Sequence, residues 1–307
     1  MFQVQENVPL AELTTFRVGG NARYFAEVHS DTDIHQALAW AHDHSVPFTI
    51  ISGGSNLLIN DAGFDGLMIR IQNMDYAFKE GVLHAGAGCN LLTVIRLAAE
   101  RRLGGWEKLA GIPGSVGGAV RGNAGAFGSE IKDFVTTVEA LHTATLESKT
   151  FLGSELGFSY RQSFFKSHPE WIIVRATFVL QITDVGESAH LINDTIAERE
   201  KRHLQDVKAA GSYFMNPKAP QHIVEMFEKE KDTRAREGRV PAGWLIEKAG
   251  MKGVKEGGAQ ASEQHPNYII NTGNATAADV LALAERIKEA VKTQFEVDLQ
   301  EEAVYVS

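Results

Sequence analysis

The sequence predicts an α+β protein built from two or three domains. Short apolar segments of strand length alternate with amphipathic segments that begin at a capping residue. The length of 307 residues exceeds what a single hydrophobic core usually holds. The 29 glycines gather in clusters after or within apolar stretches, where a backbone turns sharply or approaches a ligand.

Composition excludes several classes of function. The chain has 30 basic and 39 acidic residues, a net charge of −9, and no long basic run. It is therefore a poor candidate for binding nucleic acid non-specifically or for binding an anionic membrane. The single cysteine, Cys89, rules out an internal disulfide and a cysteine-based zinc cluster, and it suits a reducing cytoplasm. We expect no targeting signal and no membrane insertion, because the most apolar stretch, 171–182, is short and interrupted by Arg175.

Local patterns divide the chain into three units. In the first, 1–71, Ser30 caps a helix that is followed by strands at 46–51 and 63–71. In the second, 72–203, Asn90 caps a helix. Further elements are expected here, namely strands at 135–142, 150–152 and 171–182 and a surface helix at 187–203.

The third unit, 204–296, contains the helix with the clearest periodicity. Thr276 and Asp279 resemble a capping box, and the apolar residues that follow recur at helical spacing. A helix is also expected at 242–249, and a terminal strand at 297–306 closes the chain.

Two glycine-rich segments could bind a ligand through the backbone. The turn 52–56, SGGSN, offers successive N–H groups and two hydroxyls, a nest that suits a pyrophosphate without cationic side chains. The segment 110–128, AGIPGSVGGAVRGNAGAFG, has mostly small side chains, so its backbone would be the contact surface for a flat cofactor. The alternatives are an ordinary polar turn and a tightly packed structural turn.

Six motifs in order resemble one enzyme family. They are SGGSN (52–56), AGIPGSVGGAVRGNAGAFG (110–128), FSYRQS (158–163), GSYFMNP (211–217), GGAQASEQHPNYIIN (257–271) and a glutamate near the C-terminus. Together they resemble the UDP-N-acetylenolpyruvoylglucosamine reductases, and the shorter type II enzymes in particular. The resemblance covers essentially the whole chain.

The resemblance implies a fold and a reaction. Residues 1–71 and 72–203 would form the two FAD-binding subdomains of the vanillyl-alcohol-oxidase type. Residues 204–296 would form an α/β substrate-binding domain, and strand 297–307 would return to the active site. NADPH would reduce non-covalently bound FAD. Flavin N5 would then pass hydride to the vinyl carbon of UDP-N-acetylglucosamine enolpyruvate, giving UDP-N-acetylmuramate for peptidoglycan synthesis. A monomer is expected.

The same resemblance assigns catalytic roles. Arg161 would neutralise the developing charge, since its planar guanidinium suits a carboxylate, and Ser212 would be the proton donor. Aligning the end of the chain on Leu299 makes Glu302 the catalytic acid and puts Glu301 where the family has proline. Neighbouring side chains of a strand face opposite ways, so only one of these glutamates would face the site. Taken alone, Arg161 reads as a surface ion-pair residue and Ser212 as a cap.

The resemblance also assigns binding residues. Asn216, Lys252 and Gln260 would contact the UDP-sugar, although Lys252 by itself reads as a solvated charge. Met215 and Leu204 depart from the family pattern, and the loss of a positive charge at Met215 affects the expected substrate contacts. The residues expected to contact FAD are Ser52, Gly53, Gly54, Ser55, Asn56, Gly111, Ile112, Pro113, Gly114, Ser115, Gly117, Gly118, Asn123, Ala124 and Gly125.

Two other hypotheses remain open at this point. An FAD-dependent oxidase or dehydrogenase on the same scaffold would not need Ser212 and Glu302, and it often tethers its flavin through His or Cys. A flavin-binding or UDP-sugar-binding regulatory protein would tolerate the loss of Arg161, Ser212 or Glu302, and all three are present.

Overall fold

The structure is a computed structural model that describes residues 2–202 and 207–307. It divides into two compact units. Unit 1 comprises Met1–Val8, Ala22–Gly53 and Asp65–Lys201, and unit 2 comprises Pro9–Asn21, Gly54–Phe64 and Arg202–Ser307. The expected boundary at 203/204 and the departure at Leu204 lie outside the described residues. The three-part division expected from the sequence stays a prediction.

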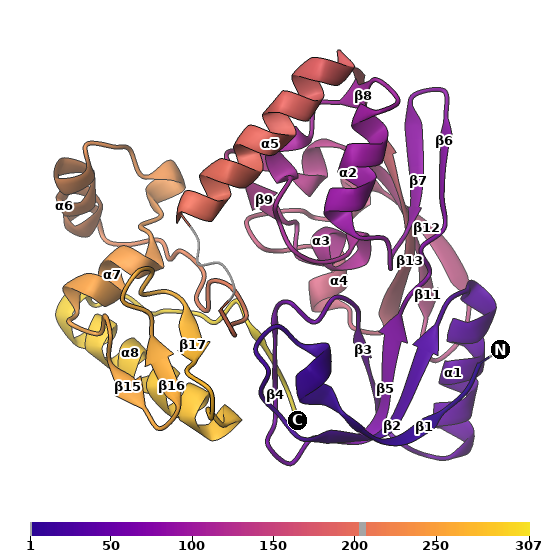
Figure 1. The fold of residues 1–307 in the computed structure, drawn as a ribbon, viewed down its shortest axis with the longest axis horizontal. Helices are drawn as coiled ribbons and strands as arrows, with labels where there is room; N and C mark the ends of the chain where they lie inside the picture. The colour runs from indigo at the N-terminus through magenta and orange to yellow at the C-terminus, as the bar shows by residue number, and fades with distance from the viewer. Residues whose placement is uncertain (1, 203–206) are drawn as a thin grey trace. The chain divides into compact units, whose positions relative to one another are not determined.

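Unit 1 is built on two sheets (Figure 1). The first has the order β1-β2-β5-β3, and its β3 and β5 run parallel. The second has the order β12-β11-β13-β7-β6 and is antiparallel throughout. The strands of the two sheets are Gln5–Pro9 (β1), Asn21–Val28 (β2), Phe48–Ile51 (β3), Phe64–Ile71 (β5), Tyr76–Lys79 (β6), Val82–Gly86 (β7), Val135–His142 (β11), Ser148–Leu152 (β12) and Trp171–Val179 (β13).

The helices of unit 1 begin where the sequence supplies a cap. Ser30 accepts a hydrogen bond from the Asp33 N–H, and Asn90 accepts one from the Thr93 N–H, both as predicted. The apolar faces of these helices enter one core together with both sheets. The helices are Asp31–Asp43 (α1), Leu91–Ala99 (α2), Val116–Arg121 (α3), Phe164–Ser167 (α4) and Val185–Arg202 (α5), and the short strand pairs are Leu103–Gly104 (β8) with Gln181–Ile182 (β14) and Gly125–Ala126 (β9) with Ser129–Glu130 (β10).

Unit 2 packs helices against a small antiparallel sheet. Its longest helix, Ala277–Phe295 (α8), has the predicted capping box of Thr276 and Asp279 and buries one apolar face. Chain segments distant in sequence join here, because Val304–Val306 (β18) runs parallel to Leu57–Ile59 (β4). The other elements are Gln221–Lys231 (α6), Ala242–Lys248 (α7), Lys255–Glu256 (β15), Ala259–Ala261 (β16) and Ile269–Asn271 (β17).

Two predicted strands were too long. The stretch 171–182 is divided into β13, which pairs with β11 and β7, and β14, which pairs with β8. The expected terminal strand 297–306 is a strand only at β18. The side chains of Val297 and Leu299 alternate inward as in a strand, but this burial comes from packing in the unit 2 core rather than from a partner strand.

Among residues 2–202 and 207–307, no helix combines the length and the apolar character needed to cross a membrane.

Candidate active site

The two glycine-rich segments approach each other in unit 1. A Cβ placed on Gly53 would lie 3.2 Å from Gly114 Cα, tighter than most Cβ contacts. Gly114 has a φ of +121°, a conformation that disfavours other residues. The backbone around it is held by the start of α2, since the Leu91 N–H donates to Gly114 O at 3.1 Å. The glycines therefore meet a steric demand of the loop itself.

Helix α3 has one packed and one open glycine. Ser115 caps the helix by accepting a hydrogen bond from the Gly118 N–H at 3.2 Å. A Cβ on Gly117 would lie 2.8 Å from Ala87 Cβ, so Gly117 is required for packing. Gly118 is exposed, and the nearest atom to its Cβ position is Ser115 Oγ at 3.5 Å. A bare backbone with open space beside it fits the close approach of a flat cofactor such as FAD.

The turn at 52–56 is shared by the two units, because Ser52 and Gly53 belong to unit 1 and residues 54–56 belong to unit 2. A Cβ on Gly54, whose φ is +63°, would collide with Leu13 O, so the close approach of a neighbouring backbone requires glycine here. Asn56 Nδ2 donates to Glu302 O at 2.8 Å. Asn56, which was assigned to FAD by resemblance, thus holds the backbone of the expected catalytic acid.

Asn123 is fully buried, and its side chain joins three neighbouring segments by hydrogen bonds. Its Nδ2 donates to Glu130 Oε2 and to Ser159 O, each at 2.9 Å, and its Oδ1 accepts from the Lys132 N–H at 3.1 Å. Burial alone would raise the pKa of Glu130, but hydrogen bonds from Lys132 and Asn123 and the charges of Lys132 and Arg161 hold this pKa below its ordinary value. The side chain of Asn123 therefore organises this region, and any flavin contact would come from its backbone.

Arg161 lies at the tip of a two-residue hairpin. Ser159 and Gln162 exchange backbone hydrogen bonds of 3.1 and 3.2 Å, and Arg161 between them has a φ of +56°. Lys166 Nζ donates to Arg161 O at 2.9 Å, and the Arg161 side chain lies over the Tyr160 ring and reaches Gly125 O at 3.5 Å. Two-residue turns commonly require a positive φ, so the turn accounts for this conformation, and the contacts fix the position of the Arg161 side chain.

Ser212 and Glu302 come from two segments that pair in unit 2. The Glu302 N–H donates to Tyr213 O at 2.7 Å, and the Met215 N–H donates to Gln300 O at 2.9 Å. Glu301 forms an antiparallel bridge with Phe214 between these bonds. Ser212 is half-buried, and its hydroxyl has no hydrogen-bond partner among the residues that the structure describes. Arg161 belongs to unit 1.

Asn267 positions the Ser212 segment, and its role was not predicted. Its Oδ1 accepts from the Phe214 N–H at 3.0 Å, its Nδ2 donates to Phe214 O at 2.9 Å, and its carbonyl oxygen accepts from the Tyr213 N–H at 2.7 Å. Asn267 is buried, so these bonds replace its contacts with water. The only sequence signal was its place in the motif 257–271.

The three residues expected to bind substrate have different surroundings. Lys252 is exposed and pairs with Glu247 at 2.8 Å, as a solvated cation would. Gln260 Nε2 donates to Gly253 O at 3.2 Å, which ties it to the same loop. Asn216 Oδ1 accepts from the Ala242 N–H at 3.0 Å at the start of α7. All three are in unit 2.

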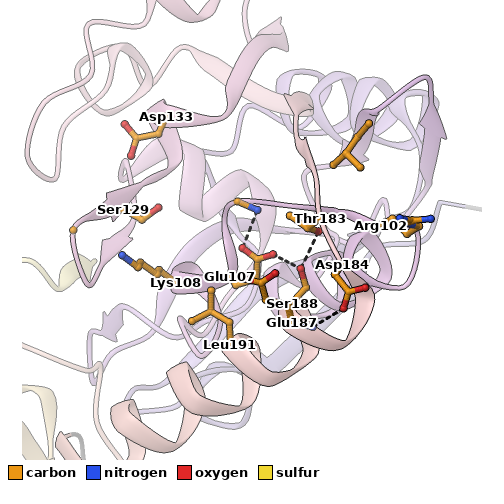
Figure 2. Close-up of a pocket in the computed structure, with 13 residues that line it drawn as sticks. Arg102, Glu107, Lys108, Ser129, Asp133, Thr183, Asp184, Glu187, Ser188 and Leu191 are labelled. Carbon is orange, nitrogen blue, oxygen red and sulfur yellow. Dashed lines mark hydrogen bonds between the residues drawn. The ribbon is translucent and has the colours of Figure 1, made fainter.

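A cavity of about 630 Å³ lies in unit 1 and is lined by none of the expected site residues. Its wall contains the buried carboxylate of Glu107, which accepts from Ser188 Oγ at 2.7 Å and from the Gly105 N–H at 2.8 Å (Figure 2). Ser188 also contacts Thr183 Oγ1 at 2.9 Å. These bonds connect β8 to the start of α5, so the polar groups of this wall are explained by the fold.

Two family models match the chain. Residues 22–145 match an FAD binding domain, and residues 202–306 match the C-terminal domain of UDP-N-acetylenolpyruvoylglucosamine reductase. A UDP-N-acetylenolpyruvoylglucosamine reductase of Solibacter usitatus is 35% identical over 99% of this chain and 96% of its own length. The chain belongs to this reductase family.

Other relatives agree with this membership. The reductase of Carboxydothermus hydrogenoformans is 38% identical over 96% of this chain and 91% of its own length. The crystal structure of the reductase from Thermus caldophilus superposes with a TM-score of 0.80 and 30% identity, covering the whole of both chains. The family identification and the α+β fold class with an FAD-binding part and a reductase C-terminal domain are confirmed.

Membership in the reductase family makes the chain an FAD-dependent oxidoreductase. The open backbone at Gly118 and the approach of Gly53 to Gly114 fit the backbone-mediated binding expected for FAD. The two family models also match separate parts of the chain, one for the cofactor and one for the reductase-specific domain.

Proposed function

We propose that the protein reduces UDP-N-acetylglucosamine enolpyruvate to UDP-N-acetylmuramate with NADPH, a reaction of peptidoglycan precursor synthesis. Family membership supports the reaction, and the pairing of 300–302 with 213–215 carries the proposal for this chain. This pairing brings the segment of the proposed proton donor, Ser212, beside that of the proposed acid, Glu302.

Bound FAD would supply hydride to the β-carbon of the vinyl ether, and the protein would manage charge and protons. Hydride addition there converts the CH₂ group to CH₃ and leaves an electron pair on the α-carbon, delocalised into the carboxylate. Arg161 would stabilise this charge through its guanidinium. Ser212 would give its proton to the α-carbon, and Glu302 would assist as the neighbouring acid.

Different segments of the chain would hold the cofactor and the substrate. The segments 52–56 and 111–118 would carry the FAD pyrophosphate, and the backbones of Ala124 and Gly125 would lie near the ring. Asn216 and Gln260 would contact the UDP-sugar. Lys252 would have to leave Glu247 before it could pair with a diphosphate. We further propose that the enzyme is a cytoplasmic monomer.

Flavin spectroscopy tests this function directly. Purified protein should be yellow, NADPH should bleach it under anaerobic conditions, and the enolpyruvyl substrate should restore the oxidised spectrum. A reducible flavin that the substrate does not reoxidise would favour another FAD-dependent oxidase or dehydrogenase on the same scaffold.

A further inference from the structure

Lys288, on α8, lies between two carboxylates and reaches the segment that carries Glu302. Its Nζ is 2.7 Å from Glu285 Oε1 and also forms an ion pair with Glu301 Oε1. Only 25% of the Lys288 side chain and 34% of the Glu301 side chain are exposed. The pair is therefore less screened by solvent than an ordinary surface ion pair.

The backbone beside Lys288 is already aligned by hydrogen bonds. Gln300 and Glu302 bond to the backbones of Met215 and Tyr213, and Asn56 Nδ2 donates to Glu302 O at 2.8 Å. The Lys288–Glu301 pair adds a side-chain tie from α8 to the residue between these bonds. It also directs the carboxylate of Glu301 toward α8.

The charges around this tie are consistent with a permanent ion pair. Burial alone would lower the pKa of Lys288, but hydrogen bonds and charge attraction from Glu285 and Glu301 raise it, so Lys288 stays protonated. The buried phenol of Tyr213 has its pKa raised by burial and then by the charges of Glu301 and Glu285. Tyr213 therefore stays neutral and adds no further negative charge.

We propose that Lys288 is a positioning residue for Glu302, acting through its ion pair with Glu301. The ion pair holds segment 300–302 against segment 213–215. It also engages the carboxylate of Glu301, so that of the two adjacent glutamates Glu302 is the acid available to the site. The inference rests on the proposed function.

Single-turnover kinetics of the FAD-bound protein test the proposal. Lys288→Met should slow flavin reoxidation by the enolpyruvyl substrate about tenfold, since a small misplacement of a catalytic group is costly. Flavin reduction by NADPH should change less than twofold. Lys288→Arg should restore most of the reoxidation rate. Glu285→Gln, which removes the other partner of Lys288, is the matched control and should change either half-reaction less than twofold.

A double-variant comparison isolates the pair itself. Glu301→Gln should slow reoxidation as Lys288→Met does, the two changes together should be no worse than either, and the exchange Lys288→Glu with Glu301→Lys should recover activity. Equal slowing of both half-reactions, additive effects, or an unaffected Lys288→Met would overturn the proposal. Urea unfolding of the wild type, Lys288→Met, Glu301→Gln and the combination of these two changes should show the same non-additivity in the free energy of unfolding, which tests the pair independently of activity. A wild-type flavin that the substrate cannot reoxidise would instead overturn the proposed function.

Discussion

The Glu302 N–H donates to Tyr213 O over 2.7 Å, which joins the end of the chain to the residue directly after Ser212. The backbone around Ser212 is thus held by the segment that carries Glu302, and the backbone of Glu302 is held by the segment that carries Ser212. The Ser212 hydroxyl, in contrast, has no bond to any residue in the described part of the chain. Removing this hydroxyl should therefore affect chemistry far more than folding.

The first prediction concerns Ser212→Ala. Reoxidation of the reduced flavin by substrate should slow by at least about 100-fold, the usual scale for losing a positioned proton donor. Reduction by NADPH should remain within twofold of wild type, as measured by stopped-flow absorbance. Ser30→Ala, which removes the cap of α1, is a suitable control because it should lower stability by about 1 kcal/mol without a selective effect on either half-reaction. Comparable damage to both half-reactions in Ser212→Ala would indicate a structural serine.

The second prediction compares two adjacent glycines of α3. Gly118→Ala has room in the protein and should leave thermal stability of the apoprotein equal or slightly higher, since alanine favours a helix. It should nevertheless weaken FAD retention on gel filtration, because the new methyl group occupies the space expected for the cofactor. Gly117→Ala should destabilise the apoprotein through its contact with Ala87. Full FAD retention by a stable Gly118→Ala protein would place the cofactor elsewhere.

The third prediction concerns Asn123→Ala, which removes a fully buried amide and its hydrogen bonds to Glu130 Oε2, Ser159 O and the Lys132 N–H. It should lower the free energy of unfolding by about 2 to 4 kcal/mol. It should also slow substrate reoxidation, because the carbonyl oxygen of Ser159, at the base of the Arg161 hairpin, loses one of its two hydrogen bonds.

Asn73→Ala is the matched control for this variant. Asn73 is also buried and holds Val174 O and the Gly88 N–H, at 2.7 and 2.9 Å, away from the hairpin. It should be destabilising without a selective effect on reoxidation. Selective loss of reoxidation in both variants would argue against a special role for the hairpin.

Features encoded within a few residues were predictable from the sequence. Ser30, Asn90 and Thr276 begin helices because each side chain satisfies an N–H three residues later. The extent of the terminal strand was not predictable, because alternating burial at Val297 and Leu299 looks the same whether a sheet or a helical core lies behind it.

Long-range pairing limited what could be predicted of the site. The motifs made Ser212 and Glu302 candidates for the site, but they did not predict the backbone bonds that join the two segments. Asn267 and Lys288 act through residues distant in sequence, and neither has a local pattern that distinguishes it from an ordinary surface or core residue. The residues 9–21 and 54–64 belong to unit 2 for the same reason, since contacts with the C-terminal part of the chain decide their place.

The last prediction concerns alkaline stability. Burial, and then the charges of Glu301 and Glu285, raise the pKa of the Tyr213 phenol above its unfolded value of about 10. The folded protein therefore retains a proton that the unfolded chain releases. The contribution of Tyr213 to stability should be constant below pH ~10 and should fall as the pH rises above it. Tyr213→Phe should make this fall less steep, measured as the urea midpoint of unfolding against pH. Tyr305→Phe, at an exposed residue of the same unit, is the control and should leave the pH dependence of the midpoint unchanged. If Tyr213→Phe and the wild type show the same pH dependence, groups other than Tyr213 set the alkaline limit.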